Sequence, residues 1–175
     1  MPHFDASSAE CLVFTYKDGL LASIAHDLEI RVERFDLDID AAPLAVRARF
    51  DATSLAVMGA HPNALGESDK RKIEQSIADE VLHVREHPAI IFSSSTVTAE
   101  GDGFRIAGEL TLHGRTRRVT FVAAPDGERD RMVATVELHQ PDFGIKPYSA
   151  MLGTLKIKPD VTVRASVPRA SLPKP

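Results

Sequence analysis

The chain has 175 residues, of which 43% are hydrophobic and 26% charged, a composition typical of a globular protein with a single domain. A net charge of −4 and few aromatic residues (8 Phe, 2 Tyr, no Trp) argue against a nucleic-acid-binding protein, which usually presents a basic face or base-stacking rings. Cys11 is the single cysteine, so an intramolecular disulfide and a CxxC motif are both excluded.

The first ten residues, MPHFDASSAE, contain neither the basic n-region nor the apolar h-region of a signal peptide. We therefore expect a cytoplasmic protein, or a periplasmic one if an export signal has been removed. No stretch approaches 18 consecutive apolar residues, so we expect no transmembrane helix. We divide the chain into an N-terminal segment (1–10), one domain (11–168) and a C-terminal tail (169–175).

Apolar and polar residues alternate along six segments, which is the pattern of strands that are buried on one face. In chain order, the apolar positions are Leu28, Ile30 and Val32; Leu37 and Ile39; Leu44, Val46, Ala48 and Phe50; Phe104, Ile106, Leu110 and Leu112; Met132, Ala134, Val136 and Leu138; and Val161, Val163, Ala165 and Val167. Residues 99–103 (AEGDG) and 125–130 (PDGERD) have the composition of turns. Because helices are not interleaved with the strands, the pattern indicates an all-β, antiparallel fold.

One segment between the third and fourth of these strands has a helical period instead. Residues 67–86 place four apolar residues on one stripe, which predicts an amphipathic α-helix: Ile73, Ile77, Val81 and Val84. Ser68 or Asp69 is expected to cap its start, and Pro88 to stop it. The basic run DKRK (69–72) is expected to be a solvated face. A shorter apolar stretch, LLASIAH (20–26), is expected to form one or two helical turns.

The most regular segment, GELTLHGRTRRVTF (108–121), predicts a hairpin with one apolar and one polar face and with a positive φ at Gly114. In total we expect about eight antiparallel strands, either closed as a barrel or stacked as a sandwich. Residues 103–113 would span ~35 Å as a strand, which favours the barrel.

Three stretches, EHPAIIFSSSTVT, GFRIAGELTLHGRTRRVTF and QPDFGI, together resemble the YceI-like polyisoprenoid-binding family. The matching positions are Pro88, Phe92, Ser93, Gly108, Leu110, Thr111, His113, Gly114, Thr116, Asp142, Phe143 and Gly144. The resemblance extends over about 11–167. It implies a lipocalin-like barrel of about eight strands, with the helix near one end and an apolar lumen that holds a long isoprenoid or similar amphiphile. The connection 140–159 is longer and more basic than this resemblance leads us to expect.

Inward-facing residues of such a barrel are candidates for contact with a lipid in the lumen: Phe50, Phe92, Phe104, Leu110, Leu112, Phe121, Met132 and Phe143. Ordinary core packing is the alternative for each of them, because an eight-stranded barrel is either filled or holds one small ligand. Small inward residues favour a cavity: Ala48, Gly108, Ala123, Ala134 and Ala165.

Polar residues at the hairpin turn are candidates for contact with a diphosphate or carboxylate head group: His113, Arg115, Arg117 and Arg118. The alternative is that they only satisfy the backbone of the turn.

The remaining histidines suggest no catalytic or metal site. His26 and Asp27 are adjacent and would point to opposite sides of a strand, so we expect Asp27 to cap backbone groups and His26 to be buried. His83 and His87 are four residues apart on the predicted helix but lack the HExxH pattern, so we expect a solvated pair at the helix end rather than a zinc site.

The sequence therefore favours non-catalytic binding, carriage or sequestration of an isoprenoid lipid of the quinone or prenyl diphosphate type, with no other cofactor. A small hydrolase or isomerase that uses His26 or His113, and a filled barrel that binds another protein, are the alternatives. The expected partners are a hydrophobic small molecule, a membrane in transient contact and a second copy of the chain.

Overall fold

The computed structural model describes residues 2–18, 27–61, 65–153 and 155–173. One α-helix, α1 (Glu67–Ser76), continues as a π-helical turn, η2 (Ile77–Val81), and short 3-10 turns are η1 (Ala52–Ser54), η3 (Gln140–Phe143), η4 (Met151–Gly153) and η5 (Arg169–Ser171). The strands are β1 (His3–Asp5), β2 (Glu10–Thr15), β3 (Lys17–Asp18), β4 (Asp27–Val32), β5 (Phe35–Ala41), β6 (Leu44–Asp51), β7 (Leu55–His61), β8 (Ala89–Glu100), β9 (Gly103–Leu112), β10 (Arg115–Asp126), β11 (Arg131–His139), β12 (Ser149–Ala150), β13 (Leu155–Ile157) and β14 (Asp160–Pro168).

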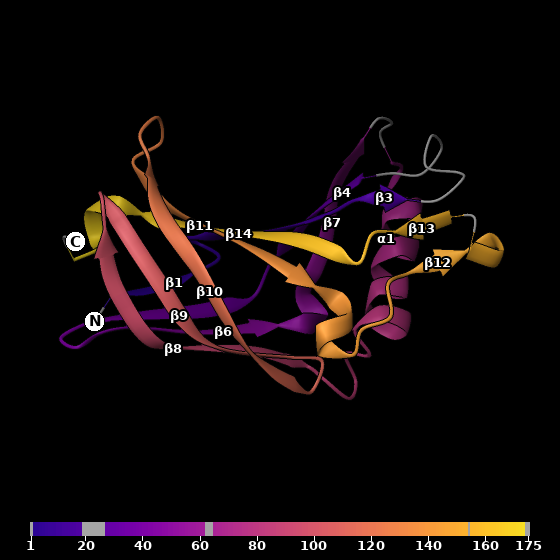
Figure 1. Ribbon diagram of the computed structural model, residues 1–175. Coiled ribbons are helices and arrows are strands. Elements are labelled where there is room, and N and C mark those ends of the chain that lie inside the picture. Colours follow the sequence, from indigo (N-terminus) through magenta and orange to yellow (C-terminus); the bar gives the residue numbers. More distant parts are fainter. Residues whose placement is uncertain (1, 19–26, 62–64, 154, 174–175) are drawn as a thin grey trace.

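The main sheet curls around an elongated interior (Figure 1). Its described strands follow the order β1-β5-β6-β8-β9-β10-β11-β14-β2-β4-β7, and every pair is antiparallel. β4 continues into β5 after two residues, and β6 continues into β7 through η1, so each pair forms one bent strand. These two strands join the β2 side of the sheet to the β8 side. The all-β antiparallel prediction is confirmed.

The number of strands differs from the expected eight because the chain bends. If β4–β5 and β6–β7 are each counted as one strand, the curled sheet has eight long strands. The bend in each of these two strands interrupts its hydrogen bonding to its neighbours, which is why each is divided into two. At the bend, the buried hydroxyl of Ser54 accepts a hydrogen bond from the Arg34 amide at 3.0 Å and donates one to the Asp51 carbonyl at 2.8 Å. The Asp51 carboxylate accepts from the Thr53 amide at 2.8 Å and pairs with the Arg34 guanidinium at 2.9 Å.

The predicted hairpin is formed by β9 and β10, with His113 and Gly114 as the two turn residues. Both have a positive φ (53° and 71°), the requirement of a two-residue type I′ turn. Gly108 does not leave space in the interior, contrary to the prediction. A Cβ there would lie 2.3 Å from the Ser93 carbonyl oxygen, because β8 bulges at Ser94–Thr96 and approaches the β9 backbone.

The helix is shorter than the predicted 67–86. It begins after Gly66, so Ser68 and Asp69 lie in its first turn rather than at its cap, and His83, with φ 48°, ends the helical path before Pro88. α1 lies beside the edge strand β7, where the Glu74 carboxylate accepts a hydrogen bond from the Val57 amide at 2.8 Å. Glu74 thereby satisfies one backbone group of an otherwise unpaired edge.

Three short strands, β12, β13 and β3, form a second sheet at the α1 end of the molecule, opposite both chain termini (Figure 1). At the other end, β1 pairs with β5, so the predicted N-terminal segment belongs to the main sheet. Leu172, in the predicted tail, packs against the hydrophobic core. In the part of the chain that the structure describes, no helix has the length and apolar character needed to cross a membrane.

Candidate functional site: an apolar cavity inside the sheet

A cavity of about 590 Å³ runs through the interior of the curled sheet. All of the apolar positions identified by alternation in the six strand segments line it. Each strand turns every second residue inward, so most of the wall consists of Val, Leu, Ile, Ala and Phe side chains. The helical stripe closes one side with Ile73, Ile77 and Val81. Transfer of a hydrocarbon group from water to such an apolar lining is favourable.

Seven of the eight predicted lumen residues lie in the cavity wall: Phe50, Phe92, Phe104, Leu110, Leu112, Phe121 and Met132. The eighth, Phe143, lies elsewhere. It sits in η3, 2% exposed, and packs within the core without lining the cavity. Phe143 was predicted as an inward residue, but it follows β11 in a 3-10 turn whose side chains do not alternate as those of a strand do.

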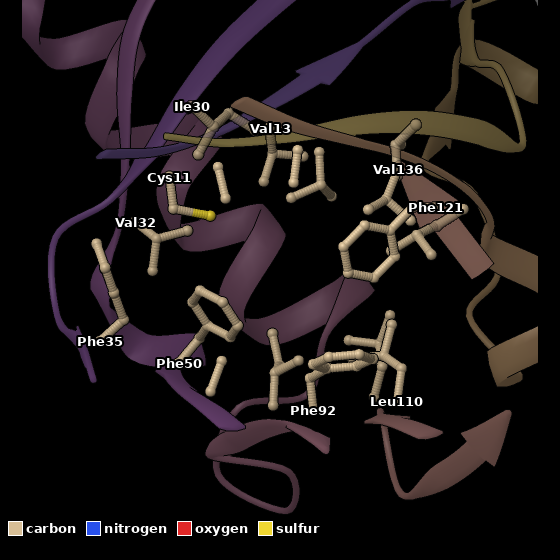
Figure 2. Close-up of a pocket in the computed structure, with 18 of the residues that line it drawn as sticks. Cys11, Val13, Ile30, Val32, Phe35, Phe50, Phe92, Leu110, Phe121 and Val136 are labelled. Atoms are coloured by element: carbon tan, nitrogen blue, oxygen red, sulfur yellow. The ribbon is translucent and has the colours of Figure 1, made fainter. Parts of the chain in front are cut away.

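Two aromatic pairs belong to the cavity wall (Figure 2). The rings of Phe35 and Phe50 have centroids 5.7 Å apart, and those of Phe92 and Phe121 are 5.4 Å apart, both in tilted contact. Small residues lie between the large ones: Ala48, Ala123, Ala134 and Ala165 all line the wall, as expected. The small side chains leave part of the interior unfilled.

The sulfur of Cys11 also lies in the wall (Figure 2). The residue is 2% exposed, and burial raises the pKa of its thiol to about 12. A thiol held protonated is a poor nucleophile, so Cys11 acts here as a small apolar side chain.

Polar side chains line the cavity at the α1 end. Lys72 comes from α1, Thr15 from the end of β2, Lys156 from β13, and Tyr148 from the residue before β12. The side chains of Lys72 and Lys156 are exposed, so the cavity reaches solvent there. The Thr15 hydroxyl is buried and has no hydrogen-bond partner within the described ranges. Neither lysine forms an ion pair with a described residue.

Sequence reasoning missed these four residues because four separate elements bring them together. Lys72 was assigned to a solvated helical face and is exposed, whereas Lys70 in the same run is half-buried and pairs with Glu67 at 3.1 Å. Lys72 lies one position before Ile73 and so reaches the cavity rim. The basic character of 140–159 was the only signal in the sequence that pointed to this end.

The predicted head-group residues lie outside the cavity. The His113 imidazole donates from Nδ1 to the Phe143 carbonyl at 3.3 Å, which leaves Nε2 to accept a hydrogen bond from His83 Nδ1 at 3.1 Å. The ring of His87 packs against it with centroids 4.6 Å apart. Burial lowers the pKa of His113, and the neighbouring His87, His83 and Arg115 lower it further against the opposing bond to Phe143.

The three predicted arginines do not line the cavity either. Arg115 and Arg117 pair with Leu112 and Leu110 and so lie on the inner face of the hairpin beyond the cavity, whereas Arg118 pairs with Glu109 on the outer face. Arg115 lies against Gly144 after η3, while Arg117 and Arg118 line a small second hollow together with His139 and Phe143. All three are exposed.

The other predicted histidine features also differ from expectation. His83 and His87 are not a helical pair, because the helix ends at His83, and both rings contact His113 instead. Asp27 caps backbone as expected, but it accepts from the amide of Lys17 in β3, at 2.8 Å. His26 lies outside the described residues. Among the residues described, no group of three or more His, Cys, Asp or Glu is arranged to hold a metal ion.

Curated relatives of the chain include the UPF0312 protein of Pseudomonas putida strain F1, which is 37% identical over 91 residues. That alignment covers 47% of this chain and 46% of the relative, so the chain spans about half the length of the curated relatives it matches.

Among solved structures, Burkholderia cenocepacia BcnA superposes with a TM-score of 0.67 at 14% identity, over 93% of this chain and 97% of that one. A polyisoprenoid binding domain from Saccharophagus degradans gives 0.55 at 12% identity, over 91% of each chain. Identities this low show a shared fold alone. The YceI-like domain, however, matches residues 6–168, which include the whole curled sheet except β1. The chain belongs to the YceI-like family.

Proposed function

We propose that the protein binds and carries, or sequesters, a single-chain isoprenoid or a similar amphiphilic lipid in its cavity. The observation that carries the proposal is the predominantly apolar wall around a hollow interior of about 590 Å³. A volume of this size lies within the range of about 300–1,000 Å³ that is typical of small-molecule sites. The description of the Saccharophagus degradans relative as a polyisoprenoid binding domain supports the same class of ligand.

The energetics favour exchange with a membrane over capture from water. A tail of about forty carbons at ~0.8 kcal/mol per methylene would release roughly 30 kcal/mol on leaving water. That value exceeds the ceiling of about 18–21 kcal/mol for non-covalent affinity. The relevant reference for such a lipid is therefore the bilayer, against which an apolar cavity is nearly neutral. A nearly balanced exchange suits carriage.

The two lysines at the α1 end of the cavity favour one orientation of the lipid. With the tail among the phenylalanines, the head group would lie beside Lys72 and Lys156, where the Tyr148 hydroxyl offers a hydrogen bond. Two ammonium groups that form no ion pair with a described residue favour an oxygen-rich or anionic head, such as a quinone or a diphosphate. The enzyme alternative gains no support from His113, whose imidazole faces His83 and Phe143 rather than the cavity.

The test is to identify what the cavity holds. Native mass spectrometry and organic extraction of the purified protein should yield a lipid with a long apolar chain. Ala134→Phe would project a ring into the cavity and should reduce the co-purified lipid at least tenfold. Thr135→Phe places the same ring on the exposed face of the same strand and should leave the lipid content unchanged. A protein that is reproducibly empty, or equal lipid content in both variants, would refute the proposal.

A further inference from the structure

The segment 144–158, which connects η3 to β14, is unlike the rest of the molecule in charge. It contains three lysines, Lys146, Lys156 and Lys158, and no acidic residue, whereas the whole chain has a net charge of −4. All three lysines are exposed, and none forms an ion pair with a described residue. The strand β3, which pairs with β13, adds Lys17 and Asp18, whose charges cancel.

The turn between β12 and β13 in this segment exposes the apolar side chain of Leu152 to solvent. Leu152, in η4 between β12 and β13, is fully exposed, and no other large hydrophobic residue in the described ranges is exposed to a comparable degree. Its φ of 56° is a left-handed conformation that leucine rarely adopts and that asparagine and aspartate tolerate. Neither packing nor backbone preference explains a leucine at this position.

The exposed leucine and the lysines lie at the end of the molecule where the cavity reaches solvent. Tyr148, Lys156 and Ile157 belong to the same segment and line the cavity. Figure 1 shows η4 at the far end of the small sheet, beyond α1 and opposite both termini. A ligand that leaves the cavity at its polar end therefore emerges beside this segment.

We propose that segment 144–158 docks the protein on an anionic lipid bilayer, with Leu152 inserted among the acyl chains and Lys146, Lys156 and Lys158 against the head groups. Each lysine near an anionic surface strengthens attachment, and one apolar side chain adds a small insertion. A protein partner fits less well, because a stable interface needs about 800 Å² per partner, and this tip offers one projecting side chain rather than an apolar face. The idea that docking serves lipid exchange rests on the proposed function. The docking itself does not depend on that function.

Co-sedimentation of the full chain with vesicles tests the proposal. Vesicles of phosphatidylcholine with 30% phosphatidylglycerol should bind the protein, and pure phosphatidylcholine vesicles should bind it much more weakly. Lys146→Glu with Lys158→Glu should reduce binding at least about tenfold, since each lysine at the surface contributes about a fivefold factor. Leu152→Asn should weaken binding while relieving the backbone strain, so its thermal stability should not fall.

The matched control is Arg129→Glu with Arg169→Glu, which makes the same charge change at the opposite end, where both arginines are exposed. This control should bind vesicles nearly as well as the unchanged protein. Equal loss in both double variants would show a net-charge effect only, and unaltered binding in Leu152→Asn would exclude insertion; either result overturns the proposal. Because the vesicles contain no isoprenoid and co-purified lipid is measured separately, a failure here is distinguishable from a failure of the proposed function.

Discussion

The single thiol of Cys11 shows how the cavity wall acts on one side chain. Sequence alone established that no disulfide could form, but it gave no sign of where the thiol lies. In the structure, the sulfur is enclosed by the apolar wall, and the cost of placing a charge there raises the pKa to about 12. The unfolded chain has no such wall, so its thiol ionises near pH 8.5–9.

This difference predicts a pH dependence of stability. The folded state favours the protonated thiol, so the contribution of Cys11 to the free energy of unfolding is complete below about pH 9. It is lost between about pH 9 and 12, at up to about 1.4 kcal/mol per pH unit. Urea unfolding under reducing conditions at pH 8, 9.5 and 10.5 should show a shallower alkaline decline for Cys11→Ala than for the unchanged protein. Parallel declines would mean that the thiol is not buried in this way.

At the scale of the strand pair, the close approach of β8 to β9 depends on one missing side chain. A Cβ on Gly108 would meet the Ser93 carbonyl oxygen at 2.3 Å and the Ser94 Cα at 2.7 Å, both backbone atoms that a side-chain rotation cannot move. Gly108→Ala should therefore lower the free energy of unfolding by roughly 1–3 kcal/mol. Chemical denaturation at neutral pH measures the effect.

Gly59, in the edge strand β7, is the matched control for this prediction. A Cβ there meets no atom within 4 Å, and its φ is not in the left-handed region. Gly59→Ala should be neutral, or stabilising by ~0.4–1 kcal/mol, because alanine reduces the freedom of the unfolded chain. Equal destabilisation by both substitutions would indicate a general glycine effect rather than contact between the strands.

The same scale shows what the sequence could predict and why. Alternation identified the inner wall because a strand has one period and one buried face, so each inward residue of β6, β9, β11 and β14 could be assigned from its neighbours. The bend at Ser54 and the bulge in β8 depend on contacts between distant segments, which no local pattern reports. Likewise, the helical period continued past the helix end, because the reversal at His83 is a backbone conformation that the apolar stripe of Ile77 and Val81 does not encode.

For the whole molecule, the wall of the site was predictable but its polar end was not. The hairpin motif drew attention to His113 and Arg115, whose side chains contact the η3 connection at Phe143 and Gly144 and do not line the cavity. Lys72, Lys156 and Thr15 lie far apart in the sequence, and only the folded arrangement of α1, β13 and β2 assembles them. A local motif can predict a turn. The residues at the rim of a cavity come from separate elements, so they depend on how the whole chain folds.

A ligand that fills the cavity should raise the free energy of unfolding of the whole protein, because it binds only the folded state. For a ligand at about a hundred times its Kd, this linkage amounts to about 2.7 kcal/mol. At ~2–4 °C per kcal/mol for a chain of this size, delipidated protein should unfold about 5–10 °C lower than protein that retains its lipid.

Differential scanning calorimetry before and after extraction, and again after reloading with the extracted lipid, measures this shift. Ala134→Phe, whose ring occupies the cavity, should show no such dependence, whereas Thr135→Phe should behave like the unchanged protein. The comparison separates loss of ligand from damage by extraction, since damage would lower the midpoint of both variants and would not reverse on reloading. Identical midpoints with and without lipid would mean that the hollow interior does not hold the ligand.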